Sequence, residues 1–241
     1  MRRMFYLRII LLLLLILVSL SACRIAEVRT FQEDREVKQG FTGERFVEVK
    51  WDSEIIPTYH ENAYDLVPLL EEFAIDPNLI KERGYQGSQG EEYSMMVQSE
   101  AKIITFDNSS SNGIIGIDLP PYDDETDLSV VIGPVIKVSL GFQLRDAGGF
   151  IAFNDFVNQV EYGDVATALR NRVGVEMAKA FGVTDPQDIK KTLVPADFEG
   201  KTIYFYGAMA LKAEPLTDEL RRAIVIVPVE LEVRDDSSSA N

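Results

Sequence analysis

Apolar residues recur at helical spacing near the start of the folded part of the chain. Val47, Trp51 and Ile55 lie four residues apart, which places the single tryptophan on one stripe of a helix. We expect this helix to end at Pro57, because proline lacks the N–H that an interior helical position requires. Trp51 is therefore interpreted as a core residue, with stacking against a ligand as the alternative.

Two shorter helices are predicted before the pattern changes. The first covers about 62–74, and with Asp65 as its N-cap Pro68 falls in the first turn, where the backbone N–H has no intrahelical partner. The second begins after Asp76, with Pro77 at its first position, and stops at Gly84. Together these patterns predict a helical segment over residues 44–84.

The pattern then becomes typical of strands. The expected elements are strands over 93–106, 114–118, 150–156, 201–211 and 223–233, a strand pair or one bent strand over 128–140, and a helix over 164–181. We expect a break near Glu100 and a tight hairpin turn at Asn112-Gly113, where glycine permits a positive φ. Pro228 inside the last strand indicates an edge or a bulge.

The order of these elements predicts an α+β fold, in which N-terminal helices precede an antiparallel β-barrel-like domain over 91–233 with one intervening helix. Segregated helices and strands favour this class over an alternating α/β chain. Three strands, a helix and two closing strands are also the order of an OB-type five-stranded barrel.

The N-terminus has the three-part pattern of a secretory signal. Three arginines precede an apolar run over 9–20, which is shorter than the roughly 20 residues that span a bilayer. The stretch Leu20-Ser21-Ala22-Cys23 resembles the lipobox of bacterial lipoproteins. That resemblance implies a signal peptide over 1–22, a lipid on the Cys23 sulfur and often an acylated amine. The alternatives are an ordinary signal peptide with an accidental cysteine, or an uncleaved anchor.

Around the predicted globular part, residues 23–43 and 234–241 have few apolar positions. The first stretch is charged and without a period, which predicts a flexible tether, and the second predicts a polar tail.

Charge and residue counts exclude several classes of function. The chain has 241 residues and a net charge of −15; without residues 1–22 it has 21 basic against 39 acidic residues, or −18. Such a surface repels phosphate backbones, so we expect no nucleic-acid binding. His60 and Cys23 are the single histidine and cysteine, so we expect neither a zinc site nor a thiol nucleophile in the globular part, and no cofactor.

The region from Ile132 to Val173 is the most densely patterned. It contains Gly133-Pro134-Val135-Ile136, Leu144-Arg145-Asp146 and the long stretch FIAFNDFVNQVEY over 150–162. With these motifs, and with 51–57, 63–70, 200–208 and 224–233, most of the mature chain resembles a family of predicted periplasmic lipoproteins of unknown function, often found beside sugar ABC-transporter components. The resemblance implies a lipid-anchored envelope protein facing the periplasm or the outside, and it brings no activity. The chain departs from the family pattern between Ile136 and Leu144, where it is a few residues longer.

Polar residues gather in this region among three phenylalanines. The candidates are Arg145, Asp146, Asn154, Asp155, Asn158 and Gln159, with Glu161 nearby. In one interpretation they bind a small sugar, whose hydroxyls meet amides and carboxylates while aromatic rings cover its face. In the other, Arg145 pairs with an aspartate, and Asn158 and Gln159 satisfy backbone groups. We favour the second, because buried amides usually have that role.

Three functions remain open at this point. The favoured one is a non-enzymatic accessory or binding module linked to sugar transport, with the membrane, a transporter component or a small sugar as partners. The alternative is a hydrolase of envelope or imported glycans, using a carboxylate pair such as Asp155 and Glu161. A two-lobed sugar-binding protein is disfavoured, because the chain lacks repeated strand–helix alternation.

Overall fold

The computed structural model describes residues 40–87, 90–109 and 112–234. Residue contacts divide the chain after Phe41, and the unit described below begins at Thr42. The predicted signal peptide, Cys23, most of the tether and the tail from residue 235 lie outside the described residues. The predicted helical segment 44–84 and the β-rich region 91–233 fall within the same compact unit.

Helices and strands alternate more than the sequence pattern suggests. The described helices are α3 (Gly43–Lys50), α4 (Ile56–Asn62), α5 (Leu66–Ile75), α6 (Leu79–Arg83), α7 (Val138–Asp146), α8 (Gln159–Ala180), α9 (Ile189–Thr192) and α10 (Asp218–Ala223). The described strands are β1 (Tyr64–Asp65), β2 (Tyr85–Gln86), β3 (Glu92–Asp107), β4 (Ile114–Asp118), β5 (Leu128–Val131), β6 (Thr202–Lys212) and β7 (Val225–Arg234). None of these helices is long and apolar enough to cross a membrane.

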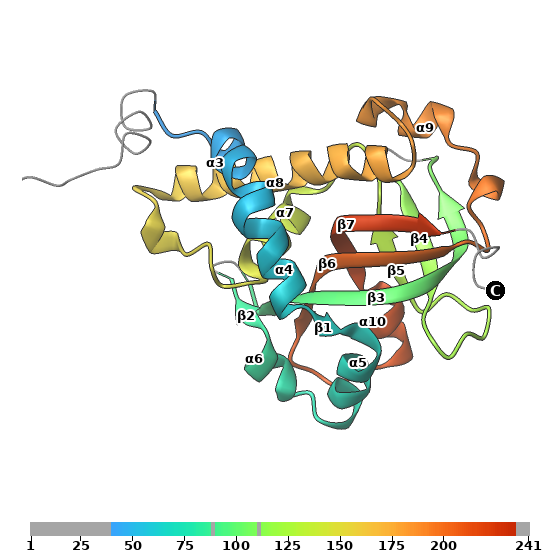
Figure 1. The fold of residues 1–241 in the computed structure, drawn as a ribbon. Coiled ribbons are helices and arrows are strands. Elements are labelled where there is room, and N and C mark those ends of the chain that lie inside the picture. Colours follow the sequence, from blue (N-terminus) through green and yellow to red (C-terminus); the bar gives the residue numbers. More distant parts are fainter. Residues whose placement is uncertain (1–39, 88–89, 110–111, 235–241) are drawn as a thin grey trace, which may run out of the picture. The chain divides into compact units, whose positions relative to one another are not determined.

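Strand pairing runs β3–β4–β5–β7–β6, and β6 pairs again with β3 (Figure 1). The strand β3 is 16 residues long and pairs with two other strands along its length. Residues Glu92 to Lys102 pair with β6, and residues Lys102 to Asp107 pair with β4. The pairing of β5 with β7 is parallel, as is that of β1 with β3. The prediction of a wholly antiparallel sheet is therefore wrong, because β7 returns to β5 only after the chain has passed through α7, α8 and β6.

The long strand β3 is continuous, so the break expected near Glu100 is wrong. Its irregularity is a register shift against β4 between Ile103 and Thr105. The bulge expected at Pro228 is confirmed, because the β6–β7 register shifts between Tyr206 and Gly207, where Gly207 pairs with Pro228. On its other side β7 pairs with β5 through Val225 and Ile226, so Pro228 lies beyond that pairing.

The tryptophan stripe continues past the predicted helix end. Val47, Trp51, Ile55 and Tyr59 are all buried at four-residue spacing. A π-helical turn over Trp51–Ile55 joins α3 to α4, and Pro57 lies in the first turn of α4. The i→i+5 bonding of this turn interrupts the regular i→i+4 pattern just before Pro57, and such an irregular turn accommodates a residue without an N–H. The prediction that the helix ends at Pro57 is wrong for this reason.

Two segments expected as strands take other forms. After β5 the chain continues through Gly133-Pro134 into α7, whose sequence VSLGFQLRD has one β-branched residue and one glycine that lower its helical preference. Residues 150–156 form a loop with a short 3-10 turn over Phe153–Asp155 instead of a strand. With α7, α8, α9 and α10 following the first strands, the prediction of one intervening helix is also wrong.

Helix α8 lies along the strands and is crossed by α3 (Figure 1). It also packs against α7 and β7. Two glycines allow these helices to approach α8 closely: a Cβ at Gly43 would lie 2.3 Å from the Asp164 carbonyl oxygen, and one at Gly141 2.4 Å from that of Ala166. The packing places the C-terminal turn of α7 between α8 and the strands, and this turn carries Arg145 and Asp146.

Candidate functional site

The buried end of α7 holds an arginine that is paired with its sequence neighbour. Arg145 is 2% exposed and Asp146 is 8% exposed. The Nε of Arg145 donates to Oδ1 of Asp146 at 2.7 Å, and Nη2 donates to Oδ2 at 3.2 Å. The third nitrogen, Nη1, donates to the Tyr162 carbonyl oxygen at 3.1 Å. This bidentate geometry offsets the large desolvation cost of two buried charges.

Tyr162 on α8 completes this group, which we call the buried cluster (Arg145, Asp146 and Tyr162). Its hydroxyl donates to Oδ1 of Asp146 at 3.0 Å, and its ring centroid lies 3.4 Å from the guanidinium carbon of Arg145. Burial, followed by the neighbouring Asp146 charge, raises the pKa of Tyr162 to about 12. The hydroxyl is thus a stable donor at neutral pH, and the cluster ties α7 to α8.

The other predicted polar residues lie around the start of α8 and are exposed. Asn158 is the N-cap, and its Oδ1 accepts from the N–H groups of Val160 and Glu161 at 2.9 and 3.0 Å. Asp155 accepts from the Ala152 N–H at 3.1 Å. Asn154 and Gln159 face solvent. Of the six candidates, the structure brings Arg145 and Asp146 into the buried cluster and leaves the other four on the surface.

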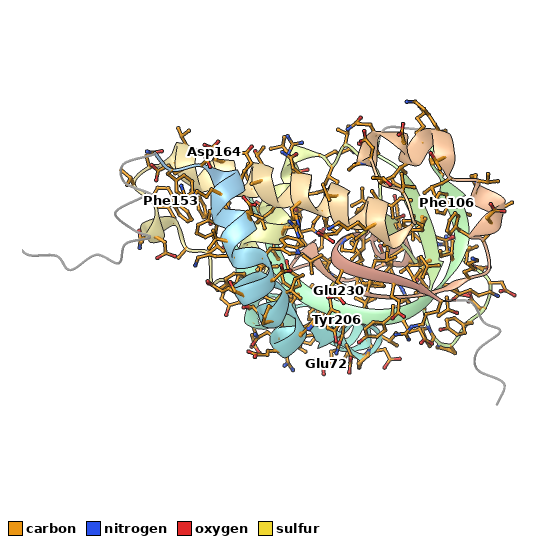
Figure 2. All side chains as sticks on the ribbon, turned by 45° about the horizontal axis from the view of Figure 1, so that its top comes forward. Glu72, Phe106, Phe153, Asp164, Tyr206 and Glu230 are labelled. Atoms are coloured by element: carbon orange, nitrogen blue, oxygen red, sulfur yellow. The ribbon has the colours of Figure 1, made fainter. Side chains whose placement is uncertain are left out.

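The carboxylate of Glu161 also has a local partner. It accepts from the Val157 N–H at 3.1 Å, so the suggested pair Asp155 and Glu161 holds backbone groups at two separate turns. Phe153 of the same segment, labelled in Figure 2, packs its ring edge-on against Tyr162, with centroids 5.5 Å apart. The segment therefore covers the buried cluster from outside.

Replacing Asn158 by alanine is expected to lower the free energy of unfolding by about 1 kcal/mol, because two N–H groups of the first turn of α8 lose their acceptor. Asn154→Ala, at an exposed position four residues earlier, should change it by less than about 0.5 kcal/mol. Urea unfolding of the two variants makes the comparison. Equal stabilities would show that the cap does not stabilise α8.

A cleft of about 520 Å³ opens beside the buried cluster, between α7 and the strands β3 and β6; we call it the polar cleft. Its polar lining includes Ser94, Gln143, Asp146 and Glu92. In the described part of the chain five polar or charged residues are buried, and Ser94, Gln143 and Asp146 are three of them. Buried polar groups that converge on a cavity of this volume are typical of a ligand site.

Two elements hold these polar groups in place. Gln143 and Asp146 are three residues apart on α7 and so share one side of the helix. The Nε2 of Gln143 donates to the carbonyl oxygens of Ala208 and Val225, which fixes the amide against β6 and β7. Across the cleft, Ser94 pairs in register with Ala210 of β6. The polar groups therefore stand on a helix and on strands, not on loops.

The net negative charge of the polar cleft comes from Glu92. Its described lining has no lysine or arginine, and the Asp146 carboxylate that also lines it is paired with Arg145. Gly87 gives access to this carboxylate, because a Cβ there would lie 2.1 Å from Oδ2 of Asp146. Such a site repels phosphates and carboxylates and suits donors, namely hydroxyl or amino groups.

Sequence reasoning missed Ser94, Gln143 and Glu92. They lie in two segments about 50 residues apart, and only the packing of α7 on β3 and β6 brings them together. The available signals were weak: a serine inside the apolar stretch YSMMV, and a glutamine in a segment that resembled a strand. Among the described residues, no three His, Cys, Asp or Glu side chains are grouped as a metal ion would need.

The single histidine lies elsewhere, on α4. The Nε2 of His60 is 2.9 Å from Oε2 of Glu230, and its ring lies 4.3 Å from that of Tyr206 (Figure 2). This contact links α4 to the outer side of β6 and β7.

The fold is that of a mixed α/β protein, and it is similar to a solved structure described as an OB-fold protein. A crystal structure of an OB-fold protein from Thermotoga maritima has a TM-score of 0.59 to this chain, with 17% sequence identity, and the similarity covers 81% of this chain and 99% of that one. At this identity the similarity concerns the fold alone. No curated protein matches the sequence.

A family model described as "Predicted periplasmic lipoprotein (DUF2291)" matches residues 13–232, and the chain belongs to this family. The resemblance stated from the sequence motifs is therefore confirmed at the level of the family. The protein is a periplasmic lipoprotein of the cell envelope, and the family description assigns it no biochemical activity.

Proposed function

We propose that this lipoprotein is a non-enzymatic binding module, anchored by lipid on Cys23, whose polar cleft holds a neutral, hydroxyl-rich ligand of sugar size. The observation that carries the proposal is the convergence of three buried polar residues, Ser94, Gln143 and Asp146, on one cleft of about 520 Å³. Gln143 is held by its bonds to Ala208 and Val225, and Asp146 by its bonds to Arg145 and Tyr162, so a ligand would meet polar groups in fixed positions.

The chemistry of the cleft supports this ligand class. Serine hydroxyls both accept and donate, whereas the Gln143 amide offers its oxygen as an acceptor because its Nε2 already donates to Ala208 and Val225. The carboxylates of Asp146 and Glu92 accept from hydroxyls. Phe142 adds an apolar ring to the lining, which suits the less polar face of a sugar. The described lining has no basic residue, which disfavours phosphorylated sugars and sugar acids as ligands.

The test is calorimetric titration of the full chain in detergent with neutral hexoses, pentoses and polyols. Ala210→Phe, which fills the floor of the cleft, is expected to weaken binding at least tenfold by occupying the ligand's volume. Ala152→Phe, at an exposed alanine outside the lining, is the matched control and should bind as the unmodified protein does. Equal affinities for both variants, or no binding of any neutral sugar, would contradict the proposal.

A link to sugar transport is the second part of the proposal. The lipid on Cys23 would hold the module at the membrane surface, where a bound sugar lies close to transport proteins. Co-purification of the tagged lipoprotein from detergent-solubilised membranes tests this, and recovery without any transporter component would contradict it.

The alternative function is a carboxylate-based hydrolase acting on envelope or imported glycans. It is favoured by one observation, that Asp146 and Glu92 line the same cleft, as two carboxyl groups of a glycosidase must. Incubation with glycan fragments and detection of new reducing ends distinguishes the two functions. Hydrolysis that is abolished by Glu92→Gln would replace the binding proposal.

We also infer that the five paired strands close as an OB-type barrel. The support is the return of pairing from β6 to β3 and the position of α8 between β5 and β6. The weakest junction is the parallel β5–β7 pair, which has two residue pairs in register. Slow amide exchange at Val130 and Ile226 would support closure there, and exchange as fast as in loops would contradict it.

A further inference from the structure

A second cavity, of about 510 Å³, differs from the polar cleft in its lining; we call it the aromatic pocket. Three aromatic rings line it: Tyr64 from β1, Tyr85 from β2 and Phe150 from the loop after α7. Its polar groups come from the end of α4, with Glu61 and Asn62, and from Arg83 of α6. None of these residues lines the polar cleft.

Two consecutive glycines make room for the aromatic wall. A Cβ at Gly149 would lie 2.2 Å from the Tyr85 ring, and one at Gly148 would lie 2.4 Å from the Phe150 ring. Gly149 also has a φ of 63°, a conformation that glycine adopts readily. The rings can thus lie against bare backbone, and Tyr85 remains 54% exposed. An exposed ring held in this way presents a face to whatever enters the pocket.

The charge of the pocket is close to balanced. Nη2 of Arg83 lies 3.2 Å from Oε2 of Glu72, and its guanidinium carbon lies 5.5 Å from the Tyr64 ring centroid. The positive charge of Arg83 is therefore partly neutralised by Glu72, and its guanidinium lies over the Tyr64 ring. Glu61 contributes a negative charge at the rim. Among the described residues of the lining nothing supplies the excess of positive charge that a phosphate requires, and the net charge of −15 also disfavours a phosphate.

We propose that the aromatic pocket binds an uncharged nucleoside, that is, a planar heteroaromatic base joined to a sugar without phosphate. Aromatic side chains stack on every base because each base has a π-face. Amide, carboxylate and guanidinium groups such as those of Asn62, Glu61 and Arg83 bond to base edges and sugar hydroxyls. A free sugar has no π-face, whereas a base can stack on the exposed ring of Tyr85.

Calorimetric titration of the full chain in detergent with adenosine and uridine tests the proposal. Tyr85→Ala should weaken binding about tenfold or more, as expected when a stacking ring is lost, while Tyr85→Phe should retain the affinity. Tyr122→Ala is the matched control, because Tyr122 is a similarly exposed tyrosine outside the pocket lining, at 46% against 54%. This control should bind nucleosides as the unmodified protein does.

Three results would overturn the proposal: no binding of either nucleoside at millimolar concentration, binding of free ribose as tight as that of adenosine, or equal binding of adenosine and its monophosphate. The proposal does not rest on the polar cleft. The cleft-filling variant Ala210→Phe should leave nucleoside binding unchanged, so the failure of one site is distinguishable from the failure of the other.

Discussion

Replacing Arg145 by alanine is expected to lower the free energy of unfolding by about 3–5 kcal/mol, because the change leaves the buried Asp146 carboxylate without its bidentate partner. The ring of Tyr162 also loses the guanidinium that lies 3.4 Å from its centroid. Urea unfolding followed by tryptophan fluorescence measures the loss, since the single tryptophan, Trp51, is 2% exposed in the folded unit.

A surface ion pair provides the matched control. Arg83 pairs with Glu72 at 3.2 Å, but both side chains are largely exposed, so Arg83→Ala should cost no more than about 1 kcal/mol. The double variant Arg145→Ala/Asp146→Ala should lose less than the sum of the two single variants, because it leaves no unpaired charge. If Arg145→Ala costs no more than Arg83→Ala, the buried cluster does not stabilise the packing of α7 on α8.

Replacing Cys23 by serine is expected to remove the protein from the membrane fraction or to block its processing. A serine hydroxyl is a much weaker nucleophile than a cysteine thiolate, so the lipid would not be attached. Two or more acyl chains, at about 0.8 kcal/mol per buried CH₂, hold a protein stably on a bilayer, and none of the described helices can span one. Fractionation and immunoblotting of membranes measure the change.

Ser19→Ala is the control for this variant, because it alters the apolar run but keeps Leu20-Ser21-Ala22-Cys23 intact. It should remain in the membrane fraction at the processed size. A Cys23→Ser protein found in the membrane fraction at that same size would refute lipidation at Cys23, and the ordinary signal peptide or an uncleaved anchor would have to be considered again.

The sequence predicted correctly those elements that a short stretch of residues specifies by itself. The buried stripe at Val47, Trp51 and Ile55, the start of α5 after Asp65 and the bulge at Pro228 all follow from spacing or from the constraints of a proline. Helix α7 was missed because its sequence has weak helical preference, and contacts with β3, β6 and α8 override that preference. The segment 150–156 is apolar without being a strand because its phenylalanines cover Tyr162.

The candidate site, too, could be predicted only in part from the sequence. Sequence reasoning could offer both a ligand site and a structural role for Arg145, Asp146 and Asn158, because it could not say which groups are buried. The tertiary structure assigns Arg145 to an internal ion pair and Asn158 to a helix cap. It also turns Asp146 toward a cleft whose other polar residues, Ser94 and Gln143, had no visible connection to it.

The sequence by itself determined the family, the envelope location and the lipoprotein class, because these depend on motifs that are read along the chain. Only the tertiary structure decided where ligands could bind. The polar cleft and the aromatic pocket are each assembled from segments more than 50 residues apart, such as Ser94 with Asp146 and Tyr85 with Phe150. The packing of α7 and its following loop on β2, β3 and β6 brings these segments together in space. No local sequence pattern encodes that packing.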